Sequence, residues 1–282
     1  RHPLYYLMIS SGVNVVLDLL FVAVMGFGVG AAALATTIAQ SLSAVLAFYR
    51  LTRPGTEYQI CWRQIKPDVP MLKRILAIGL PSGVQNSIIS LANVIVQSNI
   101  NKFGPHAMAG CGVYFKIEGF GFLPITCFAM ALSTFVSQNL GAGKTDRVRK
   151  GSIYGTLCSM GIAELVGVAV FTAAPRLMAA FNRDPDVIGF GVQQAHIETL
   201  FWCLLGLSHC CAGILRGAGK AKVSMIVMLL CWCAIRITYI TITVSIIPDI
   251  RVVFWAYPIT WTLSGILFLG YFKTRWKKVI SQ

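Results

Sequence analysis

Charged residues are scarce in this sequence. Asp, Glu, Lys and Arg make up 12% of the 282 residues, whereas a soluble domain carries about 25%. So small a charged fraction cannot cover a folded chain with water-facing surface, which excludes an ordinary soluble domain. Hydrophobic residues make up 56% and the mean hydropathy is +0.71, values typical of a chain that crosses a membrane several times.

The signatures of several other functions are also absent. The nine cysteines include a C-x-C pair, Cys231 and Cys233, but show neither zinc-finger nor redox spacing. No H-E-x-x-H or paired-aspartate motif indicates an intramembrane enzyme, and Q-N-L-G-A-G-K-T (138–145) lacks the spacing of a phosphate-binding loop. The positive charge lies between apolar stretches without a stacking platform, so nucleic acid is not an expected partner. We expect neither an enzyme nor a bound cofactor.

Apolar stretches of about 20 residues, long enough to cross a membrane, recur eight times. They cover roughly 3–25, 29–50, 72–101, 106–139, 151–172, 188–215, 223–246 and 252–272. We therefore predict an all-α fold, a polytopic transmembrane helix bundle embedded in the lipid bilayer.

The basic residues gather on one side of this bundle. The start, the tail and every second connection hold most of them, and the other connections hold only Lys102, Arg176, Arg183 and Arg251. Basic loops stay in the cytoplasm. We therefore expect a multi-pass protein of the cell membrane with both ends of the chain cytoplasmic.

An internal repeat suggests how the helices group. Residues 34–49 (LATTIAQSLSAVLAFY) align with 255–270 (WAYPITWTLSGILFLG), and both copies end a helix pair that starts inside. Parallel repeats of this kind are one plan of membrane transporters. Four further helices would then precede Arg1, so the missing N-terminal helices of the same protein are expected partners. The predicted parts are two helices of an N-terminal lobe, a cytoplasmic linker, a six-helix C-terminal lobe and a basic cytoplasmic tail, at 1–50, 51–71, 72–272 and 273–282.

One predicted helix carries a polar stripe. Steps of three or four residues place its members on one helical face; they are Asn86, Ser90, Asn93, Gln97 and Asn101. Lipid offers such side chains no partner, so they either hydrogen-bond to other helices or line a hydrated cavity between two lobes. The stripe runs nearly the full depth of the helix, which favours the cavity.

Six ionisable side chains fall within the predicted spans, where each is a functional hypothesis because of its cost in lipid. They are Asp18, Lys116, Glu118, Glu164, Glu198 and Arg236. Asp18, Glu118 and Glu198 are candidates for binding a coupling ion. Glu164 and Arg236 are candidates for a structural ion pair, and structural pairing of all six is the alternative.

Lys116 and Glu118 are two residues apart and project about 200° from one another on a helix, so they cannot share a face. We assign Lys116 and Tyr114 to the substrate cavity with the polar stripe. Two histidines, His196 and His209, could titrate near neutral pH, although buried, hydrogen-bonded rings are the expectation.

Five stretches resemble the multidrug and toxic compound extrusion (MATE) family, at matching points of its helix order. They are N-V-V-L-D-L-L-F (14–21), G-V-G-A-A-A-L-A-T (28–36), I-G-L-P (78–81), Q-N-L-G-A-G (138–143) and G-I-L-R-G-A-G-K (213–220). The resemblance implies helices five to twelve of a two-lobe, twelve-helix transporter. It also implies the export of organic, usually cationic, compounds in exchange for Na⁺ or H⁺.

The sequence departs from the NorM-like branch of that family. That branch carries a glutamate and an aspartate where this chain has Ile89 and Leu205–Gly206, so its ion site is not expected here. Two other functions stay open. One is a flippase for lipid-linked oligosaccharide, with Lys116 and Arg236 on the pyrophosphate, and the other is a fragment that does not transport.

Overall fold

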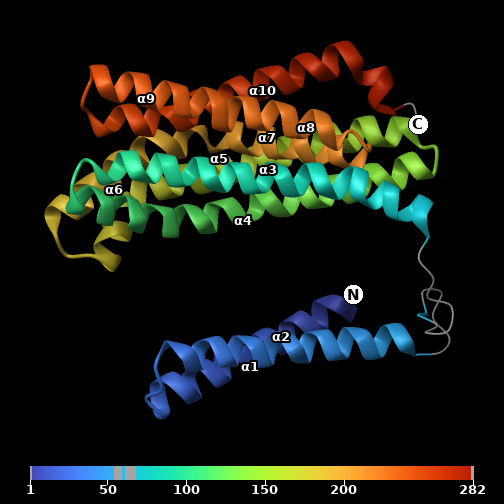
Figure 1. Ribbon diagram of the computed structural model, residues 1–282, viewed down its shortest axis with the longest axis horizontal. Helices are drawn as coiled ribbons and strands as arrows, with labels where there is room; N and C mark the ends of the chain where they lie inside the picture. The colour runs from blue at the N-terminus through green and yellow to red at the C-terminus, as the bar shows by residue number, and fades with distance from the viewer. Residues whose placement is uncertain (1, 54–58, 61–67, 281–282) are drawn as a thin grey trace. The chain divides into compact units, whose positions relative to one another are not determined.

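The structure is a computed structural model that describes residues 2–53, 59–60 and 68–280. All regular structure in these ranges is helical (Figure 1). Within them, 8 helical segments are long and apolar enough to cross a membrane. They are His2–Val24, Val29–Thr52, Val69–Asn101, Pro105–Gly141, Thr145–Phe181, Pro185–Gly217, Ala221–Ile246 and Ile250–Trp276. The predicted all-α bundle of eight spans is therefore confirmed.

Helix contacts divide the chain into two units, Arg1–Val69 and Pro70–Gln282. In the first unit, α1 (His2–Asp18) continues into a π-helical turn, η1 (Leu19–Val24), and α2 (Val29–Thr52) returns beside it. Alanines at four-residue intervals form the buried face of α2, which lets the two backbones approach closely. The Ser10 hydroxyl on α1 donates to the Ala39 carbonyl at 2.6 Å, so the pair is also joined by a buried hydrogen bond.

The second unit holds the other six spans, which run side by side (Figure 1). Its elements are α3 (Val69–Asn101), α4 (Pro105–Gly141), α5 (Thr145–Phe181), α6 (Pro185–Glu198), η3 (Thr199–Phe201), α7 (Trp202–Gly217), α8 (Ala221–Leu229), η4 (Leu230–Ile235), α9 (Arg236–Ile246) and α10 (Ile250–Ile280). Short turns join these spans. Gly104 precedes α4 with φ 98° and Gly219 follows α7 with φ 71°, a left-handed backbone that favours glycine.

Helix α7 is the most buried part of this unit, with nearly every residue from Leu205 to Leu215 inside the bundle. Its glycines allow that depth. A Cβ on Gly213 would lie 2.3 Å from the Ala129 carbonyl oxygen, and one on Gly217 equally close to that of Ser133. The two glycines are one turn apart and meet two residues one turn apart on α4. The G-I-L-R-G stretch is thus where the α4 and α7 backbones touch.

The helices extend beyond the ranges expected from hydropathy. Helix α5 begins six residues before the expected 151 and ends nine after 172. It starts among basic residues and continues through Pro175. Hydropathy marks only the stretch that suits hydrocarbon, whereas the hydrogen-bonded helix continues into the polar boundary on both sides.

The expected lobe boundaries stay predictions. Residues 54–58 and 61–67 of the expected linker lie outside the described residues, as do 281–282 of the expected tail. The described part of that tail is helical, because α10 runs on to Ile280.

Candidate functional site

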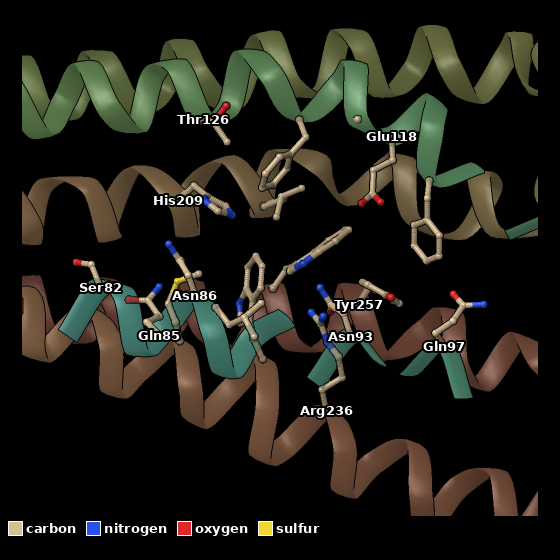
Figure 2. A pocket seen from close by; sticks show the side chains of 18 of the residues that line it. Ser82, Gln85, Asn86, Asn93, Gln97, Glu118, Thr126, His209, Arg236 and Tyr257 are labelled. Carbon is tan, nitrogen blue, oxygen red and sulfur yellow. The ribbon is translucent and has the colours of Figure 1, made fainter. Parts of the chain in front are cut away.

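A cavity of about 740 Å³ lies inside the second unit, between α3, α4, α7 and the helices that follow (Figure 2). Its wall is mixed in chemistry. The polar and charged members are Ser82, Gln85, Asn86, Asn93, Gln97, Glu118, Thr126, His209, Arg216 and Arg236, and the aromatic ones are Phe115, Phe122, Trp232, Tyr257 and Trp261. The volume lies within the usual range of small-molecule sites, about 300–1,000 Å³.

Helix α3 supplies one polar side of the cavity. Asn86, Asn93 and Gln97 of the expected stripe line it, whereas Ser90 does not. A helix turns about 100° per residue, so Asn86, Asn93 and Gln97 lie within about 40° of one another. Ser90 lies about 20° beyond Gln97, at the edge of the stripe. At the end of α3, the Gln97 amide donates to Asn101 Oδ1 at 2.9 Å.

Aromatic rings form part of the opposite side. The His209 ring on α7 meets Phe122 of α4 at 4.9 Å and Trp232 of η4 at 5.3 Å, both edge to face. The Trp232 indole donates to Ser264 Oγ at 3.2 Å, and Ser264 is itself 2.7 Å from Ser208 Oγ. The π-helical turn η4 carries Trp232 into the cavity, and this serine pair fixes the ring there.

Arg236 is the buried cation of the cavity. Its guanidinium lies over the rings of Tyr257 at 4.4 Å and Trp232 at 5.2 Å, the geometry of cation–π attraction. Its Nε and Nη2 both donate to Thr260 Oγ1, at 3.2 and 2.8 Å. Within the described residues it has no carboxylate at 4.0 Å or less.

Glu164 does not pair with Arg236. Its Oε2 accepts from the backbone N–H of Cys203 at 3.2 Å, and it also has no basic partner within 4.0 Å among the described residues. The expected ion pair between them is therefore absent from the structure. The Thr260 hydroxyl and two aromatic rings contact Arg236 where a carboxylate was expected. The Cys203 backbone amide contacts Glu164 where a cation was expected.

Glu118 projects from α4 into the cavity (Figure 2). It is partly exposed, has no hydrogen bond to the described residues, and interacts electrostatically with Arg236. Its carboxylate oxygens are therefore open to whatever occupies the cavity.

A second carboxylate, Glu198 of α6, is completely buried. It interacts electrostatically with Glu118 and Arg236. Its Oε1 accepts from Gln194 Nε2 at 2.8 Å. Among the residues that the structure describes, four buried polar atoms of this region have no hydrogen-bond partner: Glu198 Oε2, Gln194 Oε1, the Tyr114 hydroxyl and Trp202 Nε1. The Tyr114 hydroxyl interacts with both Glu198 and Trp202. We call Tyr114, Gln194, Glu198 and Trp202 the buried polar cluster.

Other expected site residues lie elsewhere. Tyr114 is buried with the cluster and Lys116 extends over the Phe181 ring at 5.8 Å, so neither lines the cavity. Asp18 belongs to the first unit, where its Oδ1 is buried and has no hydrogen-bond partner among the residues described there.

The histidines also divide. His196 is exposed, with Nε2 3.2 Å from the Phe171 carbonyl oxygen, whereas His209 Nε2 is buried and unpartnered in the cavity wall. The expectation was a buried and hydrogen-bonded ring at both positions, and neither His196 nor His209 has both properties.

Sequence reasoning missed several residues of the wall, including Gln85, Phe122, Arg216, Trp232 and Trp261. Arg216 counts as a loop cation when helices are delimited by hydropathy, yet α7 includes it. The rings come from three different elements, α4, η4 and α10, so the pattern of no single helix shows that they meet.

A membrane-spanning bundle whose polar groups converge on a cavity of this size is the architecture of a solute transporter. The MatE family model matches residues 81–248, and the chain belongs to that family. The resemblance noted above is thereby confirmed, and the compared relatives carry the names of multidrug resistance and multidrug export proteins, not of enzymes.

The relatives are distant and longer. A probable multidrug resistance protein, YpnP of Bacillus subtilis, is 24% identical over 84% of this chain and 53% of its own length. NorM of Thermotoga maritima, described in the same words, is 26% identical over 80% of this chain and 50% of its own. The chain thus spans about half the length of these relatives.

Solved structures show the same fold. A MOP superfamily transporter from Pyrococcus furiosus aligns with a TM-score of 0.89 and 22% identity, over 97% of this chain and 62% of its own. A MATE protein in complex with MaL6 aligns with a TM-score of 0.87 and 23% identity, over 96% and 62%.

Proposed function

We propose that this chain is part of a secondary exporter that moves organic, cationic drugs or toxic compounds out across the cell membrane in exchange for Na⁺ or H⁺. The observation that carries the proposal is the cavity of about 740 Å³, with a carboxylate among polar amides and aromatic rings. Family membership and relatives named as multidrug resistance and multidrug export proteins support it.

The wall suits substrates that vary in shape. Flat apolar faces from Phe122, Trp232 and Tyr257 bind rings without fixed hydrogen-bond geometry, and a cationic group gains from both the rings and Glu118. The amides of Asn86 and Asn93 offer donors as well as acceptors. A site built from such adaptable contacts is typical of a binder with many ligands.

The two carboxylates supply the coupling. An isolated ionised carboxylate away from water is costly unless it gains a partner, and Glu198 is buried with one oxygen unpartnered. Uptake of Na⁺ or a proton there removes that cost. Because Glu198 interacts electrostatically with Glu118, a cation bound at one weakens attraction for a cationic substrate at the other.

Export follows if this exchange is tied to alternating access. The incoming cation lowers the affinity of the cavity for the substrate, and rocking of the two lobes releases the substrate outside. The second lobe would include the first unit of this chain together with the missing N-terminal helices, and Asp18 is a further candidate for ion binding there. Both ends of the chain would be cytoplasmic.

A second candidate substrate class is favoured by one observation. Of the described residues, two with guanidiniums, Arg216 and Arg236, line the cavity with a single carboxylate. This arrangement suits an amphiphile with a phosphate group, as in a flippase for lipid-linked oligosaccharide. Lys116, the other cation expected on a pyrophosphate, lies over Phe181 and not in the cavity wall.

Efflux measurements test the proposal. Cells producing the protein should expel ethidium, and Glu118→Gln should abolish this. Glu164→Gln is the matched control, because Glu164 bonds to a backbone amide outside the cavity. Equal activity of the two variants would overturn the role of Glu118, and no efflux above that of cells lacking the protein would overturn export of this cation.

Proteoliposomes separate binding from coupling. Glu198→Gln should keep ethidium counterflow, which needs only substrate binding and alternating access. It should lose accumulation driven by an imposed Na⁺ or proton gradient. If Glu198→Gln retains gradient-driven accumulation, Glu198 is not the coupling site.

A further inference from the structure

An apolar groove of about 420 Å³ lies between α5, α7 and α10. It shares no lining residue with the cavity. Its wall includes Arg149, Ser152 and Leu157 from α5, Cys211 from α7, and Phe272 and Trp276 from α10. We call it the α5–α10 groove.

The groove has the length of one lipid chain. On α5 it extends from Arg149 to Met160, which at about 1.5 Å per residue is about 16 Å. The hydrocarbon core of a bilayer is about 30 Å thick, so the groove covers the depth of one leaflet. Apart from the Arg149 end, its wall is almost entirely aliphatic, aromatic and thiol-bearing.

The polar groups of the groove gather at that end. Arg149 lies in the second turn of α5, and Trp276 lies near the end of α10, the position that tryptophan favours at a membrane surface. Ser152, one turn further along α5, is only 4% exposed, and its hydroxyl has no hydrogen-bond partner in the described part of the chain. Its Oγ has almost no surface that opens to the groove, so Arg149 is the polar group that an occupant would meet at this end.

The charge of this end selects the occupant. Of the described residues, none that lines the groove is acidic, and the first turns of α5 carry Arg147, Arg149 and Lys150 against the single Asp146. Basic pockets between membrane helices bind anionic head groups. A phosphate is also the group that a guanidinium binds best.

We propose that the α5–α10 groove binds one anionic glycerophospholipid, with its phosphate on Arg149 and an acyl chain along the wall to Met160. This site is independent of the exporter cavity. It would make the packing of α5, α7 and α10 depend on the lipid composition of the membrane.

Native mass spectrometry of the delipidated, purified protein tests this with two lipids of identical chains, phosphatidylglycerol and phosphatidylcholine. One phosphatidylglycerol should bind more tightly than phosphatidylcholine. Arg149→Gln should weaken that binding about fivefold, the equivalent of about 1 kcal/mol for one basic group at the surface. Arg147→Gln is the matched control, because it removes the same charge from an exposed position outside the groove.

A steric pair locates the acyl chain. Leu157 lines the groove and is 57% exposed, so Leu157→Trp should fill the groove without disturbing the core and should remove the bound lipid. Leu165→Trp places the same ring at a position that is 72% exposed and outside the groove. Equal binding of the two lipids, equal loss in the two arginine variants, or an unchanged lipid count in Leu157→Trp would each overturn the proposal. So would the absence of any bound lipid, which would mean that protein covers the groove.

Discussion

Replacing Thr260 by valine would remove the hydrogen-bond acceptor of the buried Arg236 while leaving the side-chain shape nearly the same. Thr260 and Arg236 are 0% and 2% exposed, so little water surrounds the bond between them. Both guanidinium bonds, at 3.2 and 2.8 Å, end on that one hydroxyl. A hydrogen bond to a charged group contributes about 1.5–3 kcal/mol, and we expect a loss of unfolding free energy in this range.

Thr262→Val is the matched control, two residues along the same helix. The Thr262 hydroxyl donates to the Pro258 carbonyl just as that of Thr260 donates to the Ala256 carbonyl, so both variants lose a local bond and only Thr260→Val affects Arg236. At about 2–4 °C per kcal/mol, thermal unfolding of the detergent-purified protein should shift by about 3–12 °C more in Thr260→Val. Equal midpoints in the two variants would refute the anchoring of Arg236 by Thr260.

Two further predictions concern helix packing and orientation. Gly213→Val should push α7 away from the Ala129 carbonyl, because even a Cβ there would lie 2.3 Å from the carbonyl oxygen. This overpacking should lower the free energy of unfolding by about 2–3 kcal/mol. Gly161→Val, at a position with nothing within 4 Å of a Cβ, should change the thermal unfolding midpoint little, and equal shifts in the two variants would contradict the close contact. A membrane-impermeant maleimide added to intact cells should label Asp249→Cys but not Arg147→Cys, because the basic end of the bundle is expected inside; the reverse pattern would contradict the proposed sidedness.

The number of spans could be predicted from sequence because each apolar run is long enough to cross hydrocarbon and is followed by a turn. The helix ends could not. Helix α5 extends to Phe181 and α10 to Ile280, since a helix is held by its own backbone bonds and does not stop where hydropathy falls. The close contact at Gly213 was equally hidden, because a glycine in an apolar run does not reveal which carbonyl it faces.

The polar stripe shows how much of the cavity wall can be predicted from the periodicity of polar residues. It placed Asn86, Asn93 and Gln97 on one face, and these residues do line the cavity. It could not show which edge of the stripe turns inward. The centre of the lining face lies toward Gln85 and Ile89, so Ser90 is left outside although its spacing fits.

The ionisable residues show the corresponding limit for charge. The sequence suggested Glu164 as the ion-pair partner of Arg236. A guanidinium can also be held by ring faces and a hydroxyl, and Tyr257, Trp232 and Thr260 hold Arg236 in this way. The rings and the hydroxyl come from different helices, so no spacing in the sequence links them. Among the described residues that line the cavity, Glu118 is the carboxylate that no hydrogen bond engages.

This difference bears on which substrate charge the cavity prefers. Arg236 and Arg216 outnumber Glu118 in the wall, yet the Arg236 guanidinium is already held by two rings and a hydroxyl, whereas the oxygens of Glu118 are open to the cavity. A cation should therefore bind beside Glu118, and an anion should bind at the Arg216 end. Glu118→Gln should weaken only the first and Arg216→Gln only the second, so comparing a cationic with an anionic amphiphile of the same skeleton in both variants separates an exporter of cations from a flippase.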